Sequence, residues 1–165
     1  MQIGILGGTG PAGSALGVRL ASVGFDVVIG SRSKYRAMEV VDKLHEKWGD
    51  RHLPIAAGDN AAAAAADVVV IATPWDAAYG TATSVAEALD GKVVICMANA
   101  LTRIGNEFQP LVPPRGSVAA SVQAAVPGCR VAAAFHHVPA KELGDLSHPI
   151  ESDVLICSDF QDATD

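Results

Sequence analysis

The chain has 165 residues, of which 50% are hydrophobic and 18% are charged, and its formal net charge is -6. This composition is typical of one soluble globular domain, and no basic block is present that would neutralise nucleic-acid phosphates. No apolar run reaches the roughly 18–20 residues that a membrane-spanning helix needs. We therefore expect a single domain over residues 1–165 that binds neither nucleic acid nor a membrane.

The cysteines Cys96, Cys129 and Cys157 are scattered along the chain and form no CxxC pair. An odd, scattered set is typical of reduced thiols, which predicts a cytoplasmic protein. Cys96 and Cys157 lie in apolar runs, so we expect both to be small core residues. The first expected strand begins at Ile3, and we therefore expect no signal peptide ahead of it.

Short runs rich in Val and Ile alternate with helical stretches along the whole chain. The expected strands are Ile3–Leu6, Asp26–Ile29, Leu53–Ala57, Val68–Ala72, Lys92–Cys96, Val131–Ala134 and Asp153–Ile156. The expected helices are Ala12–Ser22, Tyr35–Trp48, Ala61–Ala66, Ala77–Leu89 and Val118–Val126. Because strand and helix alternate, the pattern predicts an α/β fold with a doubly wound, mainly parallel sheet.

Three segments depart from this regular alternation of strand and helix. Residues Asn60–Asp67 contain six alanines and are interpreted as a short helix packed close to the sheet, with Asp59 or Asn60 as its N-cap. Asn99–Ser117 is the longest irregular stretch, and both a functional loop and a surface excursion fit it. Few residues follow the last expected strand, so we expect a chain that is shortened or that has lost a helical region.

A GxGxxG motif stands between the first expected strand and the first expected helix. Its residues are Gly8, Thr9, Gly10, Pro11, Ala12 and Gly13. The first glycine permits a tight turn, the second lets the backbone approach a pyrophosphate, and the third lets the helix lie close to the strand. Pro11 suits the first helical position, where its missing N–H costs nothing. The motif predicts a Rossmann-type dinucleotide site, with a glycine turn that holds no ligand as the alternative.

The end of the second expected strand indicates which dinucleotide binds. NAD sites place an acid about 20 residues after the glycines, where it binds the ribose 2′-hydroxyl. Here Ser31 and Arg32 occupy that tip, and Arg36 or Lys34 adds a second positive charge. Ser31 can donate to a phosphate and Arg32 offers a fork that matches its oxygens. The sequence predicts NADP, with a solvated basic turn as the alternative.

Three loops follow strand ends on the sheet edge where ligands bind in open α/β sheets. They are Thr73-Pro74-Trp75-Asp76, Met97-Ala98-Asn99 and Phe135-His136-His137-Val138-Pro139. Their convergence predicts a pocket for the nicotinamide ring, and Asp76 is expected to be a helix cap.

The paired histidines of the third loop do not indicate a metal site. Adjacent residues in an extended segment point to opposite sides, and no HExxH, CxxC or carboxylate cluster accompanies them. We expect no bound metal, and one histidine lining the pocket as a hydrogen-bond donor.

These motifs together resemble those of the NADPH:coenzyme F420 oxidoreductases, the deazaflavin-dependent NADP reductases, over essentially the whole chain. The resemblance is carried by Ile5-Leu6-Gly7-Gly8-Thr9-Gly10, Gly30-Ser31-Arg32, Ala72-Thr73-Pro74-Trp75, Ala133–Ala140 and Asp153–Asp159. It implies direct hydride transfer between C4 of the nicotinamide and C5 of the deazaflavin.

The resemblance also implies roles for individual residues. Thr9, Ser31, Arg32 and Arg36 would hold the 2′-phosphate and adjacent phosphates. The Thr73-Pro74-Trp75 and Met97-Ala98-Asn99 loops would flank the nicotinamide, with His137 and Val138 packed beside it. Family members continue into a small helical region that supports the deazaflavin pocket and a homodimer contact, and we expect residues 1–165 to correspond to the family without that region.

Two other functions fit the same residues. One is an NADP-dependent reductase of another acceptor, such as a flavin or an imine. The other is a non-catalytic NADP-binding module. The absence of a paired acid and base is compatible with hydride transfer between two cofactors, since that step needs stacking and orientation rather than proton transfer by the protein.

Overall fold

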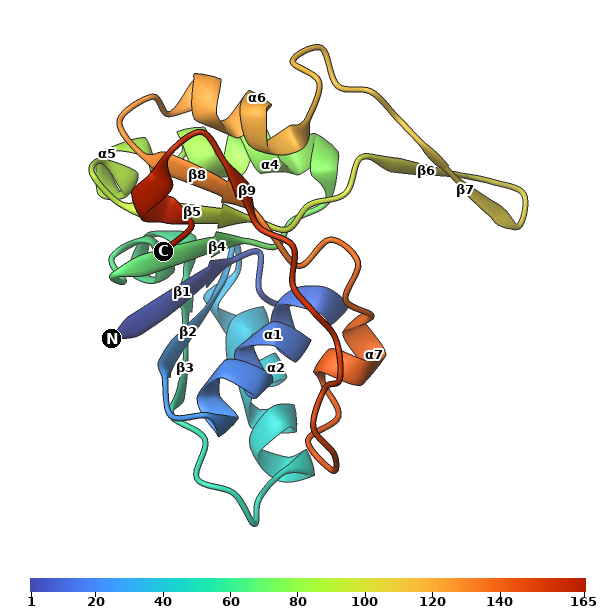
Figure 1. Cartoon of the computed structure of the whole chain (residues 1–165). Helices are drawn as coiled ribbons and strands as arrows, with labels where there is room; N and C mark the ends of the chain where they lie inside the picture. The colour runs from blue at the N-terminus through green and yellow to red at the C-terminus, as the bar shows by residue number, and fades with distance from the viewer.

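The computed structural model describes residues 1–165 and places one seven-stranded sheet between two layers of helices (Figure 1). Its strands stand in the order β3-β2-β1-β4-β5-β8-β9. They are β1 (Gln2–Leu6), β2 (Asp26–Ser31), β3 (Ile55–Asp59), β4 (Val68–Ile71), β5 (Val93–Cys96), β8 (Arg130–Ala133) and β9 (Cys157–Ser158). All pairs are parallel except β8 with β9. The predicted doubly wound, mainly parallel α/β sheet is confirmed.

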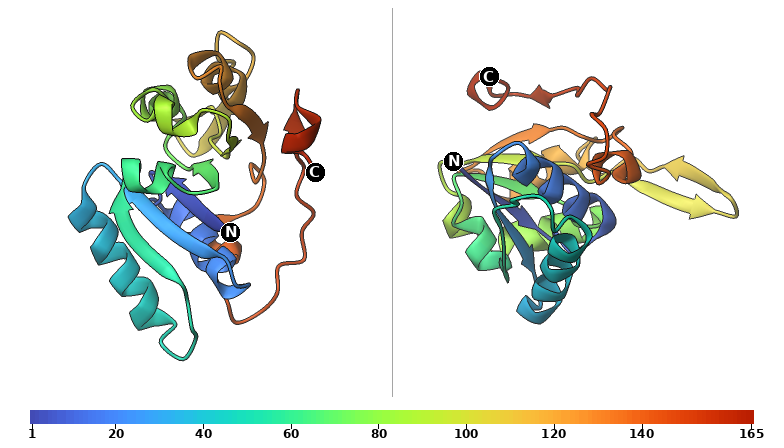
Figure 2. Two further views of the ribbon diagram at one scale, coloured as in Figure 1. Left: turned by 90° about the vertical axis from the view of Figure 1, so that its left-hand side faces the viewer. Right: turned by 90° about the horizontal axis from the view of Figure 1, so that it is seen from below.

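The helices divide between the two faces of the sheet (Figure 2). One face carries α1 (Pro11–Ser22), α2 (Lys34–Lys47) and α7 (Ala140–Leu143). The other carries α3 (Asn60–Ala64), α4 (Trp75–Thr83), α5 (Ala86–Leu89) and α6 (Val118–Ala125), and a short 3-10 turn at Gln161–Ala163 closes the chain. None of these helices combines the length and the apolar character that crossing a bilayer requires.

Strand β4 shows why the sequences of the central strands are unbroken runs of apolar residues. Val69 and Ile71 lie in the core under α3 to α6, and Val70 lies in the core under α1, α2 and α7. Successive side chains of a strand point to opposite faces, so a strand covered on both faces needs apolar residues at every position.

The alanine-rich helix α3 lies directly on the sheet because small residues meet there. A Cβ at Gly4 would stand 1.8 Å from the carbonyl oxygen of Ala63, and a Cβ at Gly30 would stand 2.7 Å from the Cβ of Ala63. The N-cap is Asp59, whose carboxylate accepts a hydrogen bond from the Ala62 N–H at 2.8 Å. The expected short helix packed close to the sheet is confirmed.

Two expectations about the segment that follows β4 are wrong. The stretch Ala77–Leu89 forms two helices, α4 and α5, separated at Ser84 and Val85. The N-cap of α4 is Pro74, with no side-chain cap hydrogen bond, so Asp76 lies in the first turn and is not the cap. The chain leaves the helical path after Thr83 because the buried Val85 turns into the core instead of continuing along the α4 surface.

The expected final strand at Asp153–Ile156 is also wrong. That segment is extended but unpaired, and β9 follows it at Cys157–Ser158. His137 Nε2 lies 2.7 Å from the carbonyl oxygen of Asp153, which brings the segment to the carboxyl edge of the sheet. The chain therefore enters the sheet from that edge and pairs antiparallel with β8. Cys157 is exposed, contrary to expectation, whereas Cys96 is fully buried.

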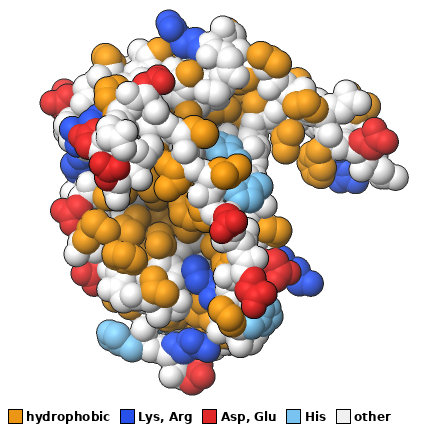
Figure 3. Space-filling model, viewed as in Figure 1, with side chains coloured by type: hydrophobic (Ala, Val, Ile, Leu, Met, Phe, Trp, Pro, Cys, Tyr) orange, Lys and Arg blue, Asp and Glu red, His pale blue; other side chains and the backbone are white.

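The stretch Asn99–Ser117 is not irregular throughout, since it contains the hairpin β6 (Leu101–Ile104) and β7 (Glu107–Pro110). Its two-residue turn has Gly105 at φ 60, a conformation that glycine adopts without strain. The hairpin stands clear of the body and exposes apolar side chains (Figure 3). The large ones on it and just after it are Leu101, Ile104, Phe108, Leu111 and Val112.

The close approach of α3 gives a stability prediction. Gly4→Ala should lower the free energy of unfolding by about 3 kcal/mol or more, because its Cβ cannot coexist with the Ala63 carbonyl. Gly80→Ala is the matched control: nothing lies within 4 Å of its Cβ, so helix α4 should gain about 0.5–1 kcal/mol. Urea unfolding of both variants is the measurement, and equal stabilities would contradict the close approach.

Candidate functional site

The glycine turn lies between the carboxyl end of β1 and the first turn of α1. Gly7 has φ 67, and the N–H of Gly8 donates to the carbonyl of Gly30 at 2.8 Å. Gly10 is the N-cap of α1. Pro11 is the first residue of the helix, the position that the sequence predicted for it. The free N–H groups of the first helical turn therefore face outward from the end of the strand, which is the arrangement that binds an anion.

The three glycines of the motif are required for different reasons. A Cβ at Gly8 would stand 2.9 Å from the carbonyl oxygen of Ile5, and one at Gly13 would stand 2.7 Å from the Cα of Gly8. Both positions therefore need glycine for packing within the protein. A Cβ at Gly10 meets only the carbonyl oxygen of Gly7, at 3.8 Å. The space over Gly10 is open, so the fold itself leaves room there for a ligand.

Asn60, at the start of α3, supports the turn from the neighbouring layer. Its Oδ1 accepts a hydrogen bond from the N–H of Gly7 at 3.2 Å. Since Asp59 caps α3, the side chain of Asn60 is free for this contact. Sequence reasoning considered Asn60 only as a cap, because no motif spacing relates it to the glycine turn.

The tip of β2 carries the residues predicted to select NADP. Ser31 is buried, and its Oγ accepts a hydrogen bond from the Ser33 N–H at 3.3 Å. Arg32 and Arg36 are exposed, and neither takes part in an ion pair. The acid nearest in register, Asp59 on β3, is occupied in capping α3. The tip therefore presents two available positive charges and one hydroxyl.

A cavity of about 340 Å³ opens beside the glycine turn. It is lined by Gly10, Pro11, Ala12, Ala72, Thr73, Pro74, Trp75, Met97, Ala98 and Asn99. Every one of these residues belongs to the set that the sequence motifs indicated. Thr73 Oγ1 is buried here without a hydrogen-bond partner, which is unusual in a folded protein and typical of a site that a ligand or water completes. A second cavity, of about 510 Å³ between α4 and α6, adjoins the first at Trp75.

The loop after β8 contacts the same site from the other side. The Asn99 side-chain amide donates to the carbonyl of His136 at 2.7 Å, and Phe135 has φ 66, which is rare for a residue with a side chain. His137 and Val138 do not line the cavity: His137 is exposed, and Val138 packs against the core that includes α1.

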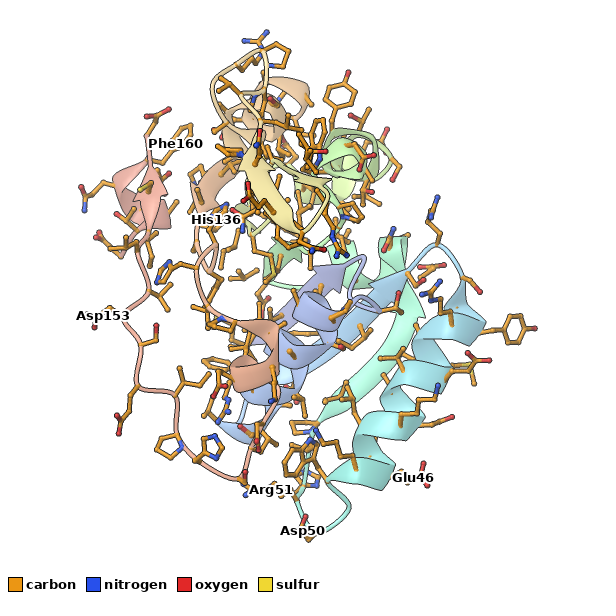
Figure 4. All side chains as sticks on the ribbon, turned by 90° about the vertical axis from the view of Figure 1, so that its right-hand side faces the viewer. Glu46, Asp50, Arg51, His136, Asp153 and Phe160 are labelled. Atoms are coloured by element: carbon orange, nitrogen blue, oxygen red, sulfur yellow. The ribbon has the colours of Figure 1, made fainter.

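The two histidines of this loop differ in their surroundings. His136 is half-buried, and burial lowers its pKa despite a hydrogen bond to the Ala98 backbone that acts in the opposite direction. Its imidazole is therefore neutral near pH 7. The ring of His137 instead lies against the carbonyl oxygen of Asp153 on the C-terminal segment. Figure 4 labels Asp153 on that segment and His136 on the loop. No group of three or more His, Cys, Asp or Glu side chains that could hold a metal is present.

Comparison with known proteins assigns the family. The model of a family described as NADP oxidoreductase, coenzyme F420-dependent, matches residues 2–100, which is more than half of the chain. The chain belongs to this family. The resemblance noted in the sequence motifs is thereby confirmed.

Two relatives match almost the whole chain. The F420-dependent NADP reductase of Methanocaldococcus jannaschii is 36% identical over 168 residues, covering 99% of this chain and 75% of that protein. The F420-dependent NADP reductase of Methanothermobacter marburgensis is also 36% identical, over 174 residues, covering 100% of this chain and 76% of that protein.

Solved structures support the fold. A putative F420-dependent NADP reductase from Arthrobacter sp. FB24 has a TM-score of 0.77 at 24% identity and covers 98% of this chain and 75% of that one. A pyrroline carboxylate reductase from Plasmodium falciparum, solved with NADP bound, has a TM-score of 0.60 at 16% identity and covers 98% of this chain and 49% of that one.

The contact between Asn60 and the glycine turn gives a testable prediction. Asn60→Ala leaves the Gly7 N–H without its acceptor, so we expect a loss of about 1–3 kcal/mol in the free energy of unfolding together with weaker NADP binding. Asn106→Ala, in the exposed hairpin turn, is the control and should change neither. Urea unfolding and calorimetric titration are the measurements, and an Asn60 variant that behaves like the control would remove this residue from the site.

Proposed function

We propose that this protein is an oxidoreductase that transfers a hydride between NADP(H) and coenzyme F420. Its family and two relatives at 36% identity, both F420-dependent NADP reductases, support the pair of substrates. The observation that carries the proposal is the cavity beside Gly10, where the loops after β4 and β5 meet the N-terminus of α1. Residues 1–165 would form one NADP-binding Rossmann domain.

The phosphates of NADP would lie along the tips of β1 and β2. Gly10 would admit the pyrophosphate over the first turn of α1, since nothing but the Gly7 carbonyl stands near its Cβ position. Thr9, Ser31, Arg32 and Arg36 would hold the 2′-phosphate and the adjacent phosphates. Both guanidinium groups are exposed and outside any ion pair, so binding a phosphate breaks no existing contact.

The nicotinamide would enter the 340 Å³ cavity between Trp75, Met97 and Asn99. The unpaired Thr73 hydroxyl offers a hydrogen bond there. The loop after β8 is joined to the cavity wall through the bond from Asn99 to the His136 carbonyl, and from behind that wall His137 and Val138 would flank the ring. With both cofactors bound, the hydride carries two electrons from NADPH to C5 of the deazaflavin, and a solvent proton completes the reduced product. The protein's own part is to orient the rings and exclude water.

The function is tested by mixing the protein with NADPH and following the visible absorbance of the oxidised deazaflavin. We expect that absorbance to fall, with no reaction when a flavin or a cyclic imine replaces the deazaflavin. Reduction of the imine or the flavin alone would overturn the proposed acceptor. Tight NADP binding without hydride transfer to the deazaflavin, the flavin or the imine would show that the protein is a non-catalytic NADP-binding module.

We further propose a cytoplasmic homodimer. Three free cysteines, with Cys157 exposed, favour a reducing compartment. The apolar side chains of the β6–β7 hairpin, Phe108 above all, favour burial against another copy of the chain. Sedimentation equilibrium measures the assembly, and a monomer at every concentration would contradict it.

Cofactor choice gives a prediction at Arg32. Arg32→Ala should weaken NADP binding by about 1.5–3 kcal/mol, roughly ten- to hundredfold, because a charge-assisted phosphate contact is lost. NAD binding should not change. Arg103→Ala, on the hairpin and hydrogen bonded only to Gly105, is the matched control. Calorimetric titration decides, and a wild type that binds NAD as tightly as NADP would contradict the assignment.

The open space over Gly10 gives a second binding prediction. Gly10→Val should abolish NADP binding while the protein stays folded, because its side chain fills the space proposed for the pyrophosphate. Gly8→Ala is the contrasting variant and should lose stability, since its Cβ would meet the Ile5 carbonyl. Thermal unfolding and NADP titration separate the two effects. A Gly10 variant that keeps its NADP affinity would show that the phosphate lies elsewhere.

A further inference from the structure

Arg19, in the last turn of α1, is hydrogen bonded to a segment more than a hundred residues further along the chain. Its Nε donates to the carbonyl of Leu143 at 3.0 Å, and its Nη1 donates to that of His148 at 3.3 Å. Its Nη2 donates to the carbonyls of Glu142, at 3.2 Å, and Asp145. All four acceptors are backbone carbonyls, and the guanidinium has no carboxylate partner.

These bonds hold α7 against α1. A helix of one turn is marginal on its own, and its last carbonyls have no partner within the helix. Arg19 supplies that partner at Glu142 and Leu143. The two helices also touch, because a Cβ at Gly144 would stand 3.1 Å from the Cβ of Ala15. The position of α7 therefore depends on α1.

Helix α7 in turn follows directly from the loop beside the cavity. Phe135 has φ 66, a strained backbone conformation for a residue with a side chain. Such a conformation persists only when contacts fix the chain on both sides of the residue. Upstream, the Ala134 N–H donates to the carbonyl of Cys96 at 3.2 Å, and directly after Phe135 the side-chain amide of Asn99 donates to the carbonyl of His136. Downstream, Pro139 is the N-cap of α7, and its carbonyl accepts a hydrogen bond from the Leu143 N–H at 2.9 Å. The strained turn is thus held between the cavity wall and α7.

We propose that Arg19 is a positioning residue for hydride transfer, a role that rests on the function proposed above. Arg19 fixes α7, and α7 fixes the Phe135–Val138 loop against Asn99 in the wall of the nicotinamide cavity. The residue itself touches neither substrate. Helix α1 therefore serves the reaction at both ends: its first turn faces the pyrophosphate, and its last turn sets the loop that flanks the reacting ring.

The test is Arg19→Met, which keeps the aliphatic stem and removes all four hydrogen bonds. We expect unchanged NADPH affinity, because the phosphate groups bind at the other end of α1. Hydride transfer in a single turnover should slow by about 10- to 100-fold, as expected for a small misplacement of a reacting ring. The fluorescence of bound NADPH should also change, and this readout needs no acceptor. Arg19→Lys should restore part of the rate.

A control separates this effect from simple destabilisation. Lys92→Met removes a hydrogen bond from the Lys92 ammonium to the Ala64 carbonyl, 2.8 Å long, at the amino end of β5 and away from the cavity. It should lower the melting temperature and leave both the transfer rate and the NADPH fluorescence unchanged. Arg19→Met variants that lose stability but match this control in rate and fluorescence would overturn the proposal.

A second variant keeps the proposal testable if Arg19→Met does not fold. Gly144→Ala retains Arg19 but pushes α7 away from Ala15 by a few tenths of an ångström. It should change the fluorescence of bound NADPH in the same direction and slow the transfer. Unchanged fluorescence and rate in a folded Gly144→Ala would also overturn the proposal. If the wild type reduces no deazaflavin, the NADPH fluorescence still tests the position of the loop, so the two proposals fail separately.

Discussion

The site depends on how closely backbone segments approach one another around the first strand. Gly4 admits the Ala63 carbonyl, Gly8 folds back on Ile5, and Gly13 brings α1 against the turn. None of these approaches is possible with a Cβ present. These close approaches place the N-terminus of α1 beside the carboxyl end of β1. The free N–H groups of the first turn of α1 therefore face the edge where β2, β4 and β5 also end.

The two halves of the sheet contribute differently to this edge. The β1–β3 half supplies charge and hydrogen bonds, through Ser31, Arg32 and the first turn of α1. The β4–β8 half supplies a largely apolar wall containing Trp75 and Met97. This division suits a ligand that is anionic at one end and a flat, weakly polar ring at the other. A site without an acid–base pair is consistent with chemistry that both cofactors carry themselves.

The residues that could be found from the sequence are those whose role depends on near neighbours. The glycine motif and the other residues that line the 340 Å³ cavity follow from strand ends and turns, which are visible in short stretches of sequence. The missed contacts join distant positions: Asn60 reaches Gly7 across 53 residues and Arg19 reaches Leu143 across 124. The prediction of a strand at Asp153–Ile156 was wrong for a related reason. An apolar run forms a buried strand only where a neighbouring strand can pair with it, and short stretches of sequence do not show whether that neighbour is present.

The C-terminal segment has a consequence for the edge of the sheet. The polar interactions that hold it along β8 are two ladder residues in β9, the bond from the Ser158 hydroxyl to the Val131 carbonyl, the His137–Asp153 contact and the Arg130–Asp162 pair. So few contacts make it a low-stability unit, whose amide hydrogens should exchange with solvent well before those of the central strands. Each time it opens, β8 becomes a bare edge with unpaired N–H and C=O groups. The C-terminal segment therefore protects the edge of the sheet only while it is bound. The fraction of time that it spends bound to β8 determines how often β8 is free to pair with a strand of another chain.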